Sequence, residues 1–267
     1  MKPVSRTAFY CCGVRGLDAR STRPVCGDLF AERFMDEEAW RTFEFRRFHG
    51  PNASNVMRHR ILDDLLRERV ARDPRRRIVL LGAGLDSRAF RLTGGRWLEV
   101  DEAQVFAWKE PRLPARDSPN EIVRLGVDFE TERLADRLAP FAGGEPVTVV
   151  LEGMLMYLEE PQVRELLRTL RGLFPRGEAL CDLMSREFFE RFARYVHEEI
   201  RGLGASFRVP ETHLAETLRA EGYRPVARES IVARAARERA APWSVRILAR
   251  LSRGFREGYE NWTFSPE

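Results

Sequence analysis

The chain has 267 residues, 43% of them hydrophobic and 32% charged, with a formal net charge of +4 at pH 7. This composition predicts one large soluble domain with a full hydrophobic core and excludes an intrinsically disordered chain. The excess charge is small and is carried almost entirely by arginine, since Lys2 and Lys109 are the only lysines, so it does not by itself indicate a nucleic-acid partner.

The cysteines and the lack of long apolar runs indicate the cellular compartment in which the protein is expected. The cysteines have no metal-ligand spacing, and we expect reduced thiols and no metal site. They are Cys11, Cys12, Cys26 and Cys181. Neither a signal peptide nor a membrane-spanning segment is recognisable, and we therefore expect a cytoplasmic protein without a membrane partner.

Residues 1–73 are predicted to form a helical cap. Apolar residues recur at helical spacing from Thr7 to Arg47, with Leu29 and Phe34 among them. The cluster at residues 48–52 interrupts this pattern. A second helix is expected to start at an Asn52 or Ser54 cap and to end at Arg72.

Residues 74–184 are predicted to form the ligand-binding core. The apolar run at 77–81 leads into the turn Gly82-Ala83-Gly84, a pattern typical of a nucleotide-binding strand, turn and helix. Glycine at 82 and 84 lets a ligand approach the backbone. Ser87 stands where a dinucleotide fingerprint has its third glycine, so the turn suits a nucleoside better than a dinucleotide.

Further strands are expected in this core at 96–101, 121–128, 147–152 and 179–183, with helical segments at 132–138 and 161–173. Alternating strands and helices predict a parallel, doubly wound, Rossmann-like α/β sheet. Asp101 ends the second strand and is our candidate for the ribose hydroxyls, while Glu99 on the same face remains an alternative.

Other candidate binding residues follow the later strands. Asp128 and Phe129 suit an adenine, the acid accepting the amine and the ring covering the base, although Asp128 can equally cap a helix. Glu152 lies between an apolar strand and a Gly-Met-Leu-Met run and needs a cationic partner, for which we expect a ligand ammonium. Arg58 can bind a carboxylate, or can simply be a surface arginine.

Beyond residue 184 the character changes. We expect a helical substrate lid at 185–222 with an apolar stripe that either packs in the core or roofs a pocket; it comprises Phe188, Phe189, Phe192, Tyr195, Val196 and Ile200. Residues 223–267 are expected to contain a strand at 224–231, a long arginine-rich helical region at 233–259 and a last strand near 262–264. The whole chain is treated as one domain.

Four segments together resemble the leucine carboxyl methyltransferase family, including its bacterial polyketide carboxyl O-methyltransferase-like members. They are residues 58–64, 81–92, 99–101 and 151–158. The resemblance implies a class I S-adenosylmethionine-dependent methyltransferase. It implies that Arg58 holds the cofactor carboxylate, that Gly82 and Gly84 lie beside the methionine part, and that Asp101 binds the ribose.

The same resemblance implies that Asp128 and Phe129 frame the adenine. Glu152 would bind the methionyl end, on the side opposite Arg58. The segment containing Arg15 and residues 28–31 resembles the family's opening helices, which fold over the cofactor. The likeness covers roughly residues 5–185; Glu102 departs from the family pattern, and the part from Phe188 onward aligns with no single member.

The expected reaction is methylation of a carboxylate on a small or medium-sized, largely apolar molecule. A carboxylate, with a pKa of about 4, arrives ionised and needs no general base, and the four histidines form no recognisable dyad, so no catalytic residue is assigned. Substrate contacts are expected from Arg15 or Arg186 for the charge, and from Tyr157, Phe188 and Phe192.

Three alternatives remain open at this point. A phenol or alcohol acceptor of secondary metabolism would call for a base such as His49 or His197. Ser87 and Glu152 argue against an NAD-dependent oxidoreductase, and the clustering of aromatic residues in apolar stripes argues against a basic nucleic-acid-binding module. The sequence makes no prediction of oligomeric state.

Overall fold

A seven-stranded sheet with the order β3-β2-β1-β4-β5-β7-β6 forms the centre of the computed structural model. The structure describes residues 3–42, 49–194, 198, 201–202, 204–208 and 214–267. The strands are β1 (Arg77–Leu81), β2 (Arg96–Asp101), β3 (Glu121–Gly126), β4 (Val147–Leu151), β5 (Gly177–Met184), β6 (Tyr223–Ser230) and β7 (Tyr259–Pro266).

The predicted α/β fold is confirmed, but the sheet is mixed and not wholly parallel. β1 to β5 pair in parallel, whereas β7 pairs antiparallel with both β5 and β6. The chain leaves β6, passes through three helices and returns as β7 between β5 and β6, which reverses its direction. Strand periodicity alone does not reveal that reversal.

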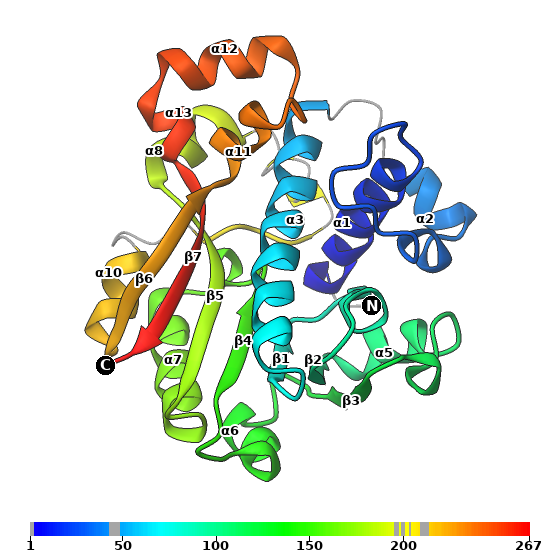
Figure 1. Ribbon diagram of the computed structural model, residues 1–267, viewed down its shortest axis with the longest axis vertical. Helices are drawn as coiled ribbons and strands as arrows, with labels where there is room; N and C mark the ends of the chain where they lie inside the picture. Colours follow the sequence, from blue (N-terminus) through cyan, green and yellow to red (C-terminus); the bar gives the residue numbers. More distant parts are fainter. Residues whose placement is uncertain (1–2, 43–48, 195–197, 199–200, 203, 209–213) are drawn as a thin grey trace.

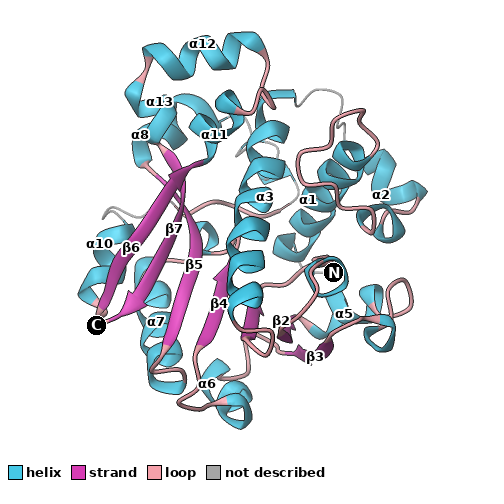
Figure 2. Cartoon of the chain, in the orientation of Figure 1, coloured by secondary structure: helices cyan, strands magenta, loops and turns pink. Residues whose placement is uncertain are grey.

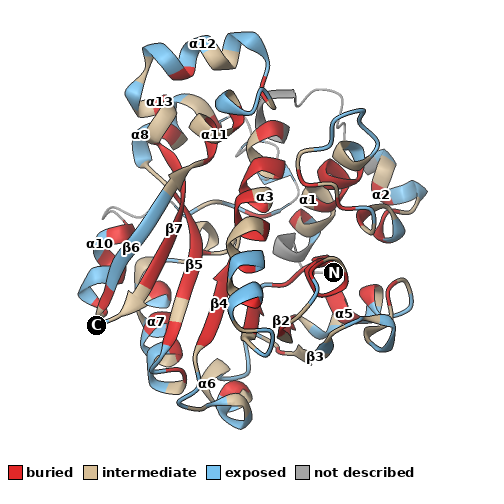
Figure 3. Cartoon of the chain, viewed as in Figure 1, coloured by how far each residue is buried: buried red, intermediate tan, exposed pale blue. Residues whose placement is uncertain are grey.

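Helices cover both faces of the sheet (Figure 2). Ile78 and Leu80 of β1 pack into a core with Leu62 and Leu66 of α3 (His49–Arg72). Val79 and Leu81 face the other way, into a core with residues of α7 (Glu160–Leu173) and α10 (Leu214–Ala220). Strand burial on both faces explains why β1 and β4 read as continuous apolar runs (Figure 3).

The remaining elements near the core are short. They are the helices α4 (Arg88–Arg91), α5 (Ala103–Lys109) and α6 (Leu134–Leu138), and the 3-10 turns η3 (Ala115–Asp117), η4 (Ala139–Phe141) and η5 (Leu155–Tyr157).

The N-terminal cap consists of α1 (Pro3–Ala19), the 3-10 turn η1 (Ala31–Phe34), α2 (Glu37–Thr42) and α3. α3 begins at His49 and not at Asn52 or Ser54, because Gly50 and Pro51 are accommodated in its first turn. Leu29, predicted on an apolar helical face, lies outside the helices and is exposed, since the segment between α1 and η1 is a loop.

A group of short helices lies beyond the carboxyl end of β5 (Figure 1). It contains α8 (Arg186–Phe188), the π-helical turn η6 (Phe189–Ala193), α11 (Ile231–Arg237), α12 (Trp243–Leu251) and α13 (Arg253–Glu257). The single helical region expected at 233–259 is thus three helices, interrupted around Pro242 and Ser252. Of the predicted lid stripe, Tyr195, Val196 and Ile200 lie outside the described residues. Within the described part of the chain, every helix is too short or too polar to cross a membrane.

Candidate active site

A cavity of about 1000 Å³ opens above the carboxyl ends of β1, β2 and β4. Its polar end is lined by Gly82, Gly84, Asp101 and Glu152, and its other end by apolar side chains of the C-terminal helices. Ligands of open α/β sheets bind at this end of the strands, next to the point where the strand order reverses. In this sheet that point lies between β1 and β4.

The turn after β1 has the backbone that its glycines allow. Gly82 and Gly84 have φ angles of +64° and +50°, in the left-handed region where side chains are disfavoured. A Cβ at Gly84 would lie 3.1 Å from the Cβ of Ala8, so α1 lies directly against the turn. α1 therefore packs on the predicted binding turn, and its expected role of covering a bound cofactor stays a prediction.

Asp101, and not Glu99, faces the cavity. The Asp101 carboxylate accepts hydrogen bonds from the backbone N–H of Gly84 at 2.6 Å and of Glu102 at 2.7 Å. Burial raises the pKa of Asp101 to about 6, and the two N–H donors offset only part of that rise. Glu99 is instead buried against Lys109 Nζ (2.8 Å) and Arg124 Nε (3.0 Å), which gives it a structural role.

Phe129 lies at the cavity, whereas the neighbouring Asp128 does not. Phe129 lines the cavity, where its ring is partly exposed, as an adenine-covering residue would be. Asp128 is outside the cavity lining, and its carboxylate accepts the backbone N–H of Glu130 at 3.0 Å. That bond forms a local turn and not the helix cap that the sequence left open, because α6 begins only at Leu134. The adenine contact of either residue stays a prediction.

Arg58 and Glu152 contact each other, which differs from the predicted placement on opposite sides of a ligand. Arg58 Nε donates to Glu152 Oε1 at 3.0 Å, and Arg58 Nη1 donates to the hydroxyl of Tyr259 at 2.8 Å. Both residues line the cavity. Within the described part of the chain Arg58 Nη2 makes no hydrogen bond, so this nitrogen keeps its capacity to donate to a ligand carboxylate.

Glu152 is neutralised by arginine side chains of the protein, in addition to any ligand ammonium. Arg88 Nη1 lies 2.7 Å from its Oε2, and His59 Nδ1 lies 3.2 Å from the same oxygen. Burial alone would raise the pKa of Glu152, but Arg88, His59 and Arg58 together hold it well below its usual range. The cationic partner that the sequence predicts for Glu152 is therefore supplied by arginines of the protein itself, and the contact of Glu152 with a ligand ammonium stays a prediction.

Arg88 is a central residue that the sequence reasoning did not single out. It is fully buried, and its guanidinium donates to Asp63 Oδ1 (2.6 Å) and Asp86 Oδ2 (2.5 Å) as well as meeting Glu152. The remaining nitrogen, Nη2, lies 2.7 Å from His59 Nδ1. Its position directly after Ser87, at the start of α4, could have indicated a role beside the binding turn. Arginine is so common in this chain that the position did not distinguish Arg88 from the others.

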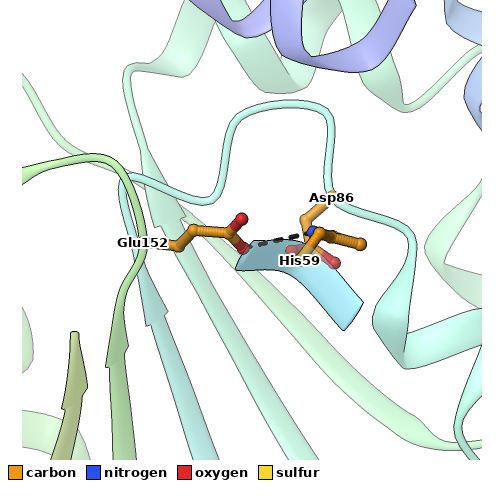
Figure 4. Close-up of side chains that lie close together, drawn as sticks. All are labelled: His59, Asp86 and Glu152. Atoms are coloured by element: carbon orange, nitrogen blue, oxygen red, sulfur yellow. Dashed lines mark hydrogen bonds and ion pairs between the residues drawn. The ribbon is translucent and has the colours of Figure 1, made fainter. Parts of the chain in front are cut away.

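His59, Asp86 and Glu152 converge closely enough to resemble a metal site, their ligand atoms lying within 4.8 Å of one another. Figure 4 shows His59 from α3 and Asp86 from the turn pointing toward Glu152. Because the Arg88 guanidinium already contacts all three, a cation stands at this position without a metal. Burial and the neighbouring Arg88 lower the pKa of His59, while Glu152 and Asp63 act in the opposite direction.

Asp182 and Tyr259 were also missed. Asp182 is buried on β5, where it accepts the Gly153 N–H at 2.6 Å and the Tyr259 hydroxyl at 2.7 Å. Tyr259 in turn receives the hydrogen bond from Arg58, so β5 and β7 hold Arg58 at the cavity. Asp182 could have been found from the sequence, because a charged residue inside the apolar run 179–183 indicates a buried polar contact. Tyr259 begins a strand far away in the sequence, and no local pattern indicates its role.

The predicted acceptor-binding arginines are not free. Arg15 lines the cavity, but its Nε donates to Asp28 at 2.9 Å and its Nη2 to the carbonyl of Leu85 at 2.8 Å. Burial would raise the pKa of Asp28, yet Arg15 and Arg91 lower it to about 2. Arg186 is exposed, lies 3.9 Å from Glu190 and is not part of the cavity lining, so the structure does not place it at the site.

The apolar end of the cavity is aromatic, as expected for a roofed pocket. Phe188 stacks on Phe255 with ring centroids 5.7 Å apart, and Phe192 meets Phe255 edge-on at 4.7 Å. Tyr157 also lines the cavity, and burial raises its pKa, so its hydroxyl stays protonated. The side chains of His49 and His197, the candidate bases, lie outside the described residues.

These features fit S-adenosylmethionine. The turn bears no side chain that would exclude a nucleoside, Asp101 offers an acceptor at the end of β2, and Arg58 Nη2 offers a donor for the α-carboxylate. Phe129 provides a ring at the open end, and Glu152 keeps carboxylate lone pairs beside the cavity for an ammonium.

The strand order and the position of this cavity are those of the class I methyltransferase fold. Two solved structures share the fold. A DUF574 family protein from Streptomyces avermitilis has a TM-score of 0.55 at 14% identity, covering 96% of this chain and 97% of that one. A magnesium protoporphyrin IX methyltransferase from Synechocystis PCC 6803 with bound S-adenosylhomocysteine has a TM-score of 0.52 at 13% identity, covering 90% and 100%.

Residues 8–171 match the leucine carboxyl methyltransferase family, and the chain belongs to that family. It is 31% identical over 207 residues to the tetracenomycin polyketide synthesis O-methyltransferase TcmP of Streptomyces glaucescens, covering 76% of this chain and 74% of that relative. It is 35% identical over 210 residues to a putative S-adenosyl-L-methionine-dependent methyltransferase of Frankia alni, covering 71% and 72%. The chain is accordingly an S-adenosylmethionine-dependent methyltransferase.

Proposed function

We propose that the protein transfers the methyl group of S-adenosylmethionine to a carboxylate oxygen of a small or medium-sized, largely apolar molecule, giving a methyl ester. The observation that carries this proposal is a single cavity that joins the Gly82–Gly84 turn to a wall formed by Phe188, Phe192 and Phe255. A cofactor at the polar end would direct its sulfonium methyl group toward a mainly apolar acceptor.

The chemistry of the lining supports an acceptor that arrives ionised. Among the described residues the cavity lining includes no histidine, and the pKa values of Tyr157 and Tyr259 are raised by burial. Protonated tyrosines donate hydrogen bonds and are poor bases at neutral pH. A carboxylate needs no proton removed, whereas most phenols and alcohols do.

Methyl transfer from a sulfonium is an in-line displacement, so the protein's task is alignment and exclusion of water. We assign the Tyr157 hydroxyl, which lines the cavity and is hydrogen-bonded with Thr7, as a donor to the acceptor carboxylate. Arg15 is less suited, because its guanidinium is already bonded to Asp28 and to the Leu85 carbonyl. The family name and the polyketide O-methyltransferase relative support an oxygen acceptor in secondary metabolism.

The test uses an aromatic hydroxy acid, which offers both acceptor oxygens in one molecule. Mass spectrometry of the product, before and after alkaline hydrolysis, separates a methyl ester from a methyl ether. We expect an alkali-labile ester, and we expect the preformed methyl ester of the same acid not to be methylated. A stable ether as the sole product, in this or a wider panel of acids, phenols and alcohols, would contradict the carboxylate assignment.

A further inference from the structure

α12 presents an apolar stripe to solvent. Trp243 and Leu251 are 73% and 81% exposed, and Ile247 and Leu248 on the same helix are also exposed. Within the described part of the chain, these are four of the nine large apolar side chains that are exposed. A helix that packs on a globular core normally buries such residues, so this face is built for a contact outside the domain.

The stripe is continuous with the wall of the cavity. Trp243, Ile247 and Leu251 follow one another at four-residue intervals and therefore lie along one side of the helix. Leu248 and Val245 come next around the helix, and both line the cavity. α12 thus carries apolar surface from the interior of the cavity to the outside of the protein.

Positive charge accompanies the stripe. The segment from Arg239 to Arg256 contains five arginines and no acidic residue. Arg253 and Arg256 pair with Glu257, whereas Arg246 and Arg250 on α12 form no ion pair with any described residue. On a helical projection these two arginines lie beside Trp243, on the side away from the cavity.

We propose that α12 docks on the surface of an anionic lipid bilayer. Trp243, Ile247 and Leu251 enter the interfacial region, and Arg246 and Arg250 contact the phosphates, as in amphipathic helices that lie in the membrane plane. If the acceptor is apolar, as the proposed function holds, it can pass along Leu248 and Val245 between the bilayer and the cavity.

Other occupants fit this surface less well. A symmetric contact of α12 with α12 of a second copy would bring Arg246 and Arg250 of each copy toward their counterparts, and α12 itself has no acidic residue to compensate. A specific protein partner usually covers about 800 Å² on each side, which is wider than one nine-residue helix. α12 also projects at one end of the longest axis (Figure 1), a shape that suits a flat surface.

This proposal departs from the expectation that the protein has no membrane partner. That expectation used the absence of an apolar run long enough to span a bilayer, and the structure agrees that no described helix can do so. Lying on a bilayer requires only one exposed stripe with adjacent cations, which is not visible until burial is known.

The test is co-sedimentation of the full-length protein with vesicles of phosphatidylglycerol and phosphatidylcholine in equal amounts, against vesicles of phosphatidylcholine alone. We expect preferential binding to the anionic vesicles. Trp243→Ser with Leu251→Ser, and separately Arg246→Ser with Arg250→Ser, should each weaken binding at least tenfold. Leu29→Ser and Arg72→Ser are controls, because both residues are exposed and lie outside α12, and both variants should bind as the wild type does.

Equal binding to the two kinds of vesicle, or the same loss in the control variants, would overturn the proposal. Binding of an acidic acyl carrier protein to α12 without binding to vesicles would overturn it in favour of a protein partner. Calorimetric titration with S-adenosylhomocysteine should give the same affinity in every variant. Vesicle binding is measured without turnover, so its failure is distinct from failure of the proposed methyl transfer.

Discussion

Two buried arginines beside the cavity have different tasks. All three nitrogens of Arg88 are bonded within the protein, to Asp63, Asp86, Glu152 and His59, whereas Arg58 keeps Nη2 available at the cavity. Arg88 therefore stabilises the turn after β1 through its bonds within the protein. Arg58 is the arginine that is placed to bind a ligand. Their substitutions should have different consequences.

Replacing Arg58 with alanine should weaken S-adenosylhomocysteine binding tenfold to a few hundredfold, about 1.5–3 kcal/mol for a charge-assisted hydrogen bond. Glu152 and Asp182 keep other partners in that variant, so the fold should persist. Arg88→Ala, in contrast, strands buried carboxylates and should cost about 3–5 kcal/mol of folding stability. Calorimetry and urea unfolding measure the two effects; unchanged ligand affinity in Arg58→Ala would remove that residue from the site.

Asp101 should make cofactor binding depend on pH. Its pKa of about 6 is raised from the ordinary value, mainly by burial, and ribose hydroxyls donate to its ionised form. Affinity for S-adenosylhomocysteine should therefore rise as pH increases from 5 to 7. The ligand's own groups do not change charge in this range, because its α-carboxyl pKa is about 3.5 and its α-amino pKa about 7.8. Calorimetry across this range should show a flatter profile in Asp101→Asn. A rise of equal size in that variant would exclude Asp101 as its source.

At the residue scale, the sequence predicted those cavity residues that stand at the end of a strand. Gly82, Gly84 and Asp101 stand at strand ends, where the fold itself brings them to the cavity. The contact between Arg58 and Glu152 joins residues 94 positions apart and depends on how α3 crosses the sheet. No local pattern determines that crossing.

At the scale of elements, α1 controls access to the binding turn. Arg15 bonds it to Leu85 and Asp28, and Ala8 lies against Gly84. This arrangement places α1 against the polar end of the cavity. Gly84 has two reasons to be glycine, its positive φ and its close neighbour. The turn and α1 should therefore respond together to a change at this position.

Gly84→Ala should lower stability by about 1–2 kcal/mol, since an alanine is strained at φ +50° and its Cβ would meet Ala8 at 3.1 Å. Displacement of α1 should also weaken cofactor binding. Gly172→Ala is the matched control, because its Cβ would meet nothing within 4 Å and alanine favours the helix α7. Urea unfolding of both variants checks this; equal stability of the two would contradict the account of the turn.

The sequence located β1 and β2 to the residue and the other strands to within a few residues. Buried parallel strands are short apolar runs bounded by turns, and that pattern is local. It could not show that β7 returns antiparallel between β5 and β6, or that the region after β6 is three helices, because both depend on packing against residues far away in the chain.

At the scale of the whole molecule, a buried chain of charges ties the N-terminal cap to the sheet. Asp28 holds Arg15 of α1 and accepts from Ser87 at 2.5 Å, while Asp63 of α3 binds Arg88 and Arg91. Each carboxylate has a pKa below its ordinary value because neighbouring groups outweigh the effect of burial: Arg15 and Arg91 beside Asp28, and His59, Arg88 and Arg91 beside Asp63. The cap and the core should accordingly lose stability together in acid.

A depressed carboxyl pKa contributes stability that is present above the unfolded value of about 4 and lost as pH falls through the folded value. For Asp28 that window runs from about 4 down to about 2. The difference in urea unfolding free energy between wild type and Asp28→Asn should therefore narrow as pH falls from 5 toward 2.5. A difference that stays constant over this range would show that Asp28 carries no depressed pKa.

The cavity as a whole was beyond sequence reasoning. Its apolar end combines α8 and η6, which end at Ala193, with α11, α12 and α13, which begin only at Ile231. The stripe with Phe188 and Phe192 was visible, but its partner Phe255 belonged to a region predicted as one long helix. The acceptor pocket emerges only when the two segments meet beyond β5.

The measurement that tests the central claim most directly is a calorimetric and thermal-unfolding comparison of S-adenosylhomocysteine, NAD and duplex DNA. The cavity predicts binding of S-adenosylhomocysteine at one site per chain, and a stabilisation of roughly 2.7 kcal/mol at about 100 times the dissociation constant. NAD and DNA should give neither. Stabilisation by NAD or DNA without any by S-adenosylhomocysteine would contradict the assignment of this cavity as a methyl-donor site.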